Sequence, residues 1–182
     1  MQATRGTSLS STDPAEHQPS APRHRLLFVV VALAAYAVDV GTKLLAVAHL
    51  TPDDPVDVVG GLVRLDLVRN PGAAFSTGTS YTLFLSVIAL MAAGAVVRFG
   101  RRLGDATWAV ALGLLLAGVC GNLTDRVFRE PGFLRGHVVD FLELPHWPVF
   151  NVADMLIDAA ILLIVVQTWR GVGLTGARQA RS

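Results

Sequence analysis

The sequence predicts a membrane protein, mainly α, with four transmembrane helices and a small extracytoplasmic β-sheet, or cradle, between helices 1 and 2. Three observations support this fold class. Apolar residues make up 52% of the 182 residues, and charged residues only 16%. The apolar residues gather in four blocks, each near the length of about 20 residues that a helix needs to cross a bilayer. Between the first two blocks, the pattern changes to the alternation that is typical of β-strands.

The chain divides into nine segments. The first is a tail rich in Ser, Pro, Thr and Gln, a composition that favours disorder because it buries too little apolar surface. The expected segments are a disordered cytoplasmic tail over 1–24, helix 1 over 25–48, a β-hairpin region over 49–80, helix 2 over 81–99, a cytoplasmic loop over 100–105, helix 3 over 106–124, an extracytoplasmic loop over 125–149, helix 4 over 150–169 and a cytoplasmic tail over 170–182.

The first apolar block could be read as a cleaved signal peptide, because Arg23 and Arg25 precede it and an Ala-Val-Ala sequence over 46–48 imitates a cleavage site. Two features favour a retained helix instead. The block is long enough to span the bilayer, and Asp39 and Lys43 interrupt its second half. These two lie four residues apart on one helical face, in the acid-before-base order that pairs well. We therefore expect a membrane-spanning helix.

The segment after this helix has the signature of a β-hairpin. Apolar and charged residues alternate over 56–59 and again over 62–67, on either side of Gly60 and Gly61. The sequence Asn-Pro-Gly over 70–72 then indicates a turn. We expect a small sheet that lies on the membrane surface.

Charge placement predicts the topology. Arginines cluster before helix 1, between helices 2 and 3, and after helix 4, whereas the two long loops hold most of the acids. Basic residues mark the cytoplasmic side of short loops, so both termini are expected there and the long loops outside. The net charge of +1 gives no support for nucleic-acid binding, and the single Cys120 excludes an internal disulfide.

Two aspartates in the last third of the chain are the candidate chemistry. Asp140 lies in an apolar, strand-like run, and Asp154 follows Asn151 by three residues where helix 4 begins. Simpler interpretations stay open: Asp154 and Asn151 form a helix N-cap, and Asp140 is a solvated loop acid. If the two carboxylates meet, repulsion on the order of 4 kcal/mol at about 4 Å makes them share one proton. Such a pair can activate water, as aspartic proteases do.

Other polar residues accompany this pair, each with a simpler structural interpretation. Gly121 and Asn122 can end helix 3, Asp125 and Arg126 can form a loop ion pair, and Asn70 can form a turn. Neither an H-E-x-x-H zinc motif nor a G-x-S-x-G serine motif occurs. An aspartyl mechanism is the remaining hydrolytic chemistry.

Two other function classes would use the same polar residues in other ways. A small ion-coupled carrier would use Asp39, Lys43, Asp140 and Asp154 as an ion path, which places acids near the middle of the bilayer. A non-catalytic scaffold would use the same polar residues only for caps and turns.

Five separate stretches carry a family resemblance. They are DVGTK over 39–43, RNPGAAFS over 69–76, GNLTDR over 121–126, GHVVDF over 136–141 and FNVAD over 150–154. With these motifs in this order on four apolar blocks, the sequence resembles the lipoprotein signal peptidases (signal peptidase II), a family of aspartyl peptidases. The segment over 127–135 departs from the family pattern, because it is longer than in most members.

The resemblance implies a membrane endopeptidase that removes signal peptides from diacylglyceryl-modified prolipoproteins, cutting before the lipidated cysteine. It implies catalytic roles for Asp140 and Asp154, without a metal or organic cofactor. It also implies a monomer in the bacterial inner (cytoplasmic) membrane, with the active site at the outer face, in contact with membrane lipid and open to globomycin-type inhibitors. The supporting or substrate-binding residues that it implies are Asp39, Lys43, Asn70, Gly72, Asn122, Asp125, Arg126, Asn151 and Ala153.

Overall fold

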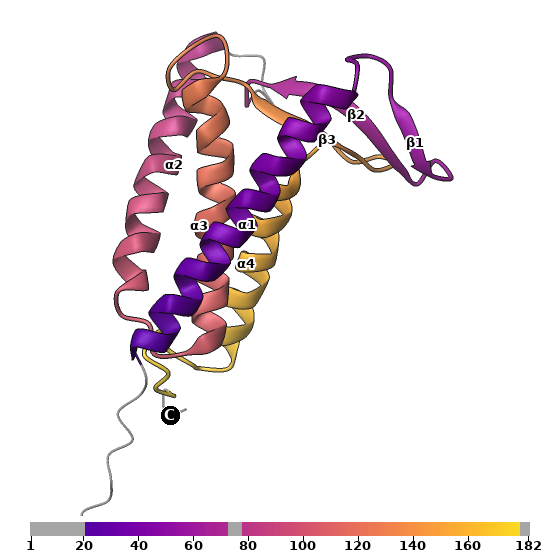
Figure 1. Ribbon diagram of the computed structural model, residues 1–182. Coiled ribbons are helices and arrows are strands. Elements are labelled where there is room, and N and C mark those ends of the chain that lie inside the picture. Colours follow the sequence, from indigo (N-terminus) through magenta and orange to yellow (C-terminus); the bar gives the residue numbers. More distant parts are fainter. Residues whose placement is uncertain (1–20, 73–77, 179–182) are drawn as a thin grey trace, which may run out of the picture.

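Four long helices form a bundle, and a three-stranded sheet projects to one side from one end of it (Figure 1). The computed structural model describes residues 21–72 and 78–178. All four helices are long and apolar enough to cross a membrane. We call the end of the bundle that carries the sheet the sheet end. Helix α1 starts at the opposite end, and the described part of the chain also finishes there. The elements are α1 (Ala21–His49), β1 (Val56–Val59), β2 (Val63–Asn70), α2 (Gly78–Gly100), α3 (Ala106–Phe128), β3 (Val138–Glu143) and α4 (Val152–Trp169).

Helix α3 packs against each of the other three helices. Glycines on α3 allow this close approach, as small residues do between membrane helices. A Cβ at Gly118 would collide with the backbone of Ala153 on α4, and one at Gly121 would collide with the Asp39 carboxylate on α1. One interpretation of the sequence, that Gly121 helps to end the helix, does not hold, because α3 continues past it and its lack of a side chain serves helix contact.

Helix α3 therefore continues one turn past the expected end. Asp125 and Arg126, expected in a loop, lie in its last turn. The long connection that follows returns to the helix, where the Gly136 amide donates to the Arg126 carbonyl oxygen at 2.9 Å. This return directs the chain into β3.

The predicted hairpin is confirmed, but the sheet has a third strand. Strands β1 and β2 are antiparallel, with Val56 opposite Leu65. Strand β3 pairs antiparallel with β2 and places Asp140 opposite Val68. The sequence placed the sheet only between the first two helices. The third strand was not assigned to it because its pairing partner lies about 70 residues earlier in the chain.

The chain ends also differ from expectation. Helix α1 already begins at Ala21, so the last four residues of the predicted tail are helical; residues 1–20, 73–77 and 179–182 lie outside the described part. At the opposite end, residues 171–178 pack on the start of α3, where the Trp108 indole N–H donates to the Val172 carbonyl oxygen at 2.9 Å.

The helices present large apolar side chains outward, such as Leu33, Met91 and Leu162, each more than 60% exposed. Outward apolar side chains are what a bilayer environment requires. Charged side chains are instead buried between the helices near the sheet end, among them Asp39 and Lys43. This buried polar group is where the site lies.

Candidate active site

Asp140 is buried in β3, with 2% of its surface exposed. Two side-chain amides donate to its carboxyl group. The Asn70 Nδ2 atom, at the end of β2, lies 2.8 Å from Oδ2, and the Asn151 Nδ2 atom lies 2.5 Å from Oδ1. The sheet pairing brings Asn70 to Asp140, and the start of α4 brings Asn151.

Both amides are oriented by backbone groups. The Asn70 Oδ1 atom accepts the Gly72 N–H at 2.7 Å, and the Asn151 Oδ1 atom accepts the Asp154 N–H at 3.2 Å. Because an amide oxygen can only accept, each side chain is left with its NH₂ group pointing at Asp140. The carboxyl group therefore sits in a preformed pair of donors.

Asp154 lies in the first turn of α4, within reach of the same asparagine. Its Oδ2 atom accepts the Asn151 N–H at 3.2 Å, which completes a capping box. Its Oδ1 atom accepts from the Asn122 amide at 2.8 Å. The predicted cap is present, and it holds the carboxyl group of Asp154 beside Asp140, because Asn151 contacts both acids.

The surroundings raise the pKa of Asp140 from its ordinary value of 3.8 to about 6. Loss of solvation through burial is the largest cause, and the charge of Asp154 adds to it. The hydrogen bonds from Asn70 and Asn151 and the charge of Lys43 oppose the rise. A carboxyl group that titrates near neutral pH is suited to acid–base catalysis.

Lys43 is the centre of a buried ion network behind the two acids. Its Nζ atom, in a side chain that is 1% exposed, lies 3.0 Å from Asp39 Oδ2 and 2.9 Å from Asp125 Oδ2. It also donates to the Asn122 Oδ1 atom at 2.9 Å. That contact leaves the Asn122 NH₂ group for Asp154, so Lys43 orients Asp154 through Asn122. The sequence predicted the pair with Asp39, but only the fold adds Asp125.

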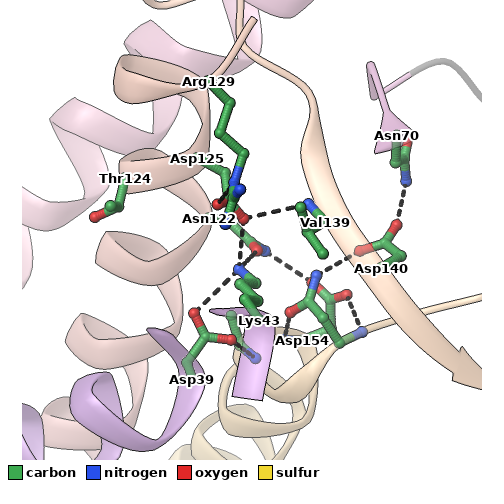
Figure 2. A network of polar contacts seen from close by, with 12 residues as sticks. Asp39, Lys43, Asn70, Asn122, Thr124, Asp125, Arg129, Val139, Asp140 and Asp154 are labelled. Atoms are coloured by element: carbon green, nitrogen blue, oxygen red, sulfur yellow. Dashed lines mark hydrogen bonds and ion pairs between the residues drawn. The ribbon is translucent and has the colours of Figure 1, made fainter. Parts of the chain in front are cut away.

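The two remaining carboxylates attach the helices to the site. The Asp39 Oδ1 atom accepts the Ala153 N–H at 2.8 Å, which fixes the start of α4 to α1. The Asp125 Oδ2 atom accepts the Val139 N–H at 3.2 Å, and Oδ1 pairs with Arg129. Asp125 thereby holds β3 at the residue next to Asp140 (Figure 2).

Arg126 and Gly72 face each other beside the acids. Gly72 has a φ of +86°, which glycine adopts without strain. A Cβ there would lie 3.3 Å from an Arg126 Nη1 atom. Within the described residues that nitrogen is buried without a hydrogen-bond partner. The guanidinium group therefore offers a free donor, although it makes no ion pair with either acid in this part of the chain.

Comparison with known proteins decides the family. The family model for signal peptidase (SPase) II matches residues 31–170. The chain belongs to the signal peptidase II family. This makes it an aspartic peptidase, a hydrolase, rather than an ion carrier or a scaffold.

Relatives of this peptidase agree over most of its length. A lipoprotein signal peptidase of Rhodococcus jostii (strain RHA1) is 49% identical over 162 residues, which cover 89% of this chain and 82% of the relative. The lipoprotein signal peptidase of Mycobacterium avium (strain 104) is 51% identical over 150 residues, 82% of each chain.

Two solved structures of bacterial membrane enzymes share the fold of the peptidase. The structure at 1.9 Å resolution is 27% identical, with a TM-score of 0.70 over 78% of this chain and 91% of the other. The structure at 2.3 Å, 24% identical, also has a TM-score of 0.70, over 85% of this chain and 94% of the other.

Two polar residues of the peptidase near the site were missed at the level of sequence. On α2, the Thr82 hydroxyl donates to the Pro71 carbonyl oxygen and the Ser86 hydroxyl donates to the Leu134 carbonyl oxygen, both at 2.7 Å. Both side chains are buried. They tie α2 to the turn after Asn70 and to the connection before β3. Their signal was two hydroxyls four residues apart within an apolar block.

The site offers carboxyl groups, amides and cations. In residues 21–72 and 78–178, no three His, Cys, Asp or Glu side chains are grouped so as to hold a metal ion.

Proposed function

We propose that this peptidase removes signal peptides from diacylglyceryl-modified prolipoproteins and cuts just before the lipidated cysteine, with Asp140 and Asp154 as the catalytic pair. The observation that carries the proposal is the contact of Asn151 with both carboxyl groups at the sheet end. Family membership supplies the reaction class, and the names of the relatives indicate lipoprotein precursors as substrates.

The chemistry needs one proton shared between the two acids. The ionised carboxylate takes a proton from a water molecule, and the water oxygen attacks the scissile carbonyl carbon. The protonated acid donates a hydrogen bond to the carbonyl oxygen and stabilises the tetrahedral intermediate. The carbon–nitrogen bond then breaks, and the departing amine of the cysteine takes a proton from the pair. Water is the only co-reactant, so the pair ends as it began.

The neighbours of the pair have separate roles in this proposal. Asn70 and Asn151 orient Asp140, Asn122 orients Asp154, and the Arg126 donor binds a substrate oxygen. Asp39, Lys43, Asp125 and Ala153 hold the helices together. Gly72 leaves the space beside Arg126 open.

The proposal includes a location. The arginines at the opposite end of the bundle, such as Arg98, Arg101 and Arg170, mark that end as cytoplasmic. The sheet end then lies at the outer face of the bacterial inner membrane, where lipoprotein precursors present the modified cysteine. The enzyme acts as a monomer among membrane lipids, and globomycin-type peptides inhibit it.

Cleavage of a defined precursor tests the function. The full chain, purified in lipid or detergent, is incubated with a diacylglyceryl-modified prolipoprotein, and the shorter product is measured. Wild type should cleave it, whereas Asp140→Asn and Asp154→Asn should lose at least about 10³-fold in rate, because each removes half of the acid–base pair.

A matched control is Asp66→Asn on β2, an aspartate without a hydrogen bond or ion pair in the described part of the chain. It should cleave at the wild-type rate. An unmodified precursor should be cut poorly. Normal cleavage by either Asp140→Asn or Asp154→Asn, with folding retained, would overturn the catalytic assignment.

A further inference from the structure

A second acid lies deeper in α4 than the catalytic Asp154. Asp158 is the seventh residue of the helix, about 9 Å along its axis from the first at 1.5 Å per residue. The surrounding helix is long and apolar enough to cross a membrane. Asp158 therefore lies within the apolar span and not at its rim.

Asp158 shares a flank of α4 with Asp154. Residues four apart on a helix differ by about 40° around the axis and about 6 Å along it. The face of α4 that packs into the bundle carries other residues, namely the buried Ala153, Ala160 and Gln167. Asp158 points away from that face and is exposed. It thus lies about one helical turn farther into the span than Asp154, on an exposed side of α4.

This position is costly without a ligand. In the described residues, no hydrogen bond or ion pair involves Asp158, whereas Asp154 has both a cap and an amide partner. An acid within the apolar part of a membrane helix is costly when it has no partner. A short Asp side chain cannot reach the rim about 9 Å away. Helix capping does not explain the presence of Asp158 either, because Asn151 and Asp154 already cap α4.

A substrate of the proposed function brings groups that need such an acceptor. Its signal peptide crosses the membrane as a helix, and a peptidase must unwind the chain around the scissile bond to reach the carbonyl carbon. Unwinding inside the apolar layer leaves backbone N–H groups without partners, and each costs several kcal/mol there. With the sheet end at the outer face, as proposed, the residues before the scissile bond lie deeper in the membrane than Asp154, at the level of Asp158.

We propose that Asp158 is a substrate-binding residue that accepts hydrogen bonds from backbone N–H groups of the unwound signal peptide. The 6 Å from Asp154 to Asp158 corresponds to about two residues of extended chain at roughly 3.3 Å each. The partners are therefore the amides two or three residues before the scissile bond. This assignment rests on the proposed function and adds a binding position inside the membrane to it.

Steady-state kinetics on the full chain in lipid test the assignment. A hydrogen bond to a charged group is worth about 1.5–3 kcal/mol, so Asp158→Leu should raise KM by roughly 10- to 100-fold. Its kcat should change less than about threefold. Asp158→Asn keeps an acceptor oxygen, so its KM should lie between those of wild type and Asp158→Leu. The control Ala159→Leu changes the next, also exposed position, about 100° around the helix, and should match wild type.

Substrates with a single ester in place of an amide identify the partner, because an ester lacks the N–H group. An ester two or three residues before the scissile bond should raise KM for wild type but add nothing for Asp158→Leu. Such non-additivity marks direct contact. Folding is checked by thermal unfolding, where Asp158→Leu should be at least as stable as wild type.

Three results would overturn the assignment. The first is a KM for Asp158→Leu within twofold of wild type. The second is an ester penalty that is the same with and without Asp158 at every position. The third is failure of the wild type to cleave the modified precursor, which would refute the proposed function and the assignment with it. This failure is distinct from the first two results, because it is seen with wild type alone.

Discussion

Replacing Asp140 by asparagine should stabilise the protein above pH 6 while abolishing cleavage. Burial raises the pKa of Asp140 from 3.8 to about 6, so the folded chain binds this proton more tightly than the unfolded chain does. Between these two values, stability falls as pH rises. At about 1.4 kcal/mol per pH unit, the difference corresponds to about 3 kcal/mol lost between pH 3.8 and 6. Asparagine carries no charge at any of these pH values and avoids this loss.

The assay is thermal unfolding of wild type and Asp140→Asn in the same detergent, from pH 4.5 to 8. The Tm of the variant relative to wild type should rise with pH and level off above about pH 7. At pH 4.5, where wild-type Asp140 is protonated, asparagine should be neutral or slightly destabilising, because its NH₂ group meets the amide donors of Asn70 and Asn151. If the Tm values of wild type and Asp140→Asn change in parallel across this pH range, burial does not raise the pKa of Asp140.

Three further predictions concern the neighbours of the pair. In Asn70→Ala, Asp140 loses a hydrogen bond that lowers its pKa. If Asp140 is catalytic as proposed, the corresponding limb of the kcat/KM profile should move to higher pH; an unmoved limb contradicts this. Lys43→Met leaves buried carboxylates without their cation and should lower the free energy of unfolding by about 3–5 kcal/mol, measured by thermal or denaturant unfolding. A second change, Asp39→Asn, should restore part of this loss. Gly72→Ala forces a side chain into a φ of +86° and against a Leu85 methyl group at 2.5 Å, so it should lower both Tm and activity. Adding Leu85→Ala should recover only the part of the Tm loss that the collision causes. Full recovery would exclude a contribution from backbone strain.

The local features of the chain could be predicted because their causes lie close together in sequence. Four apolar blocks specify four spanning helices, and two glycines between alternating segments specify the β1–β2 hairpin. The cap formed by Asn151 and Asp154 follows from a spacing of three residues. The pairing of Asp39 with Lys43 follows from one helical turn. Each depends on neighbours within a few residues.

Helix ends were predicted less well, because contacts decide them. Gly121 resembles a stop signal, yet α3 continues past it, since the glycine provides space for Asp39 on α1. As a result, Asp125 lies on a helix and reaches both Lys43 and the backbone of Val139. Thr82 and Ser86 gave too weak a signal in an apolar block, because their partners are loop carbonyl groups that only the fold brings near.

The sequence by itself determined the class of this protein, its four spans, its family motifs and the two candidate acids. Only the tertiary structure decided that β3 pairs with β2, which carries Asn70 to Asp140 across 70 residues of sequence. It also decided that Asn151 contacts both acids and that Lys43 acts on Asp154 through Asn122. The physical reason is that spans and caps depend on local hydrophobicity and hydrogen bonding. The burial and the long-range contacts that shift a pKa exist only after the helices and the sheet have packed.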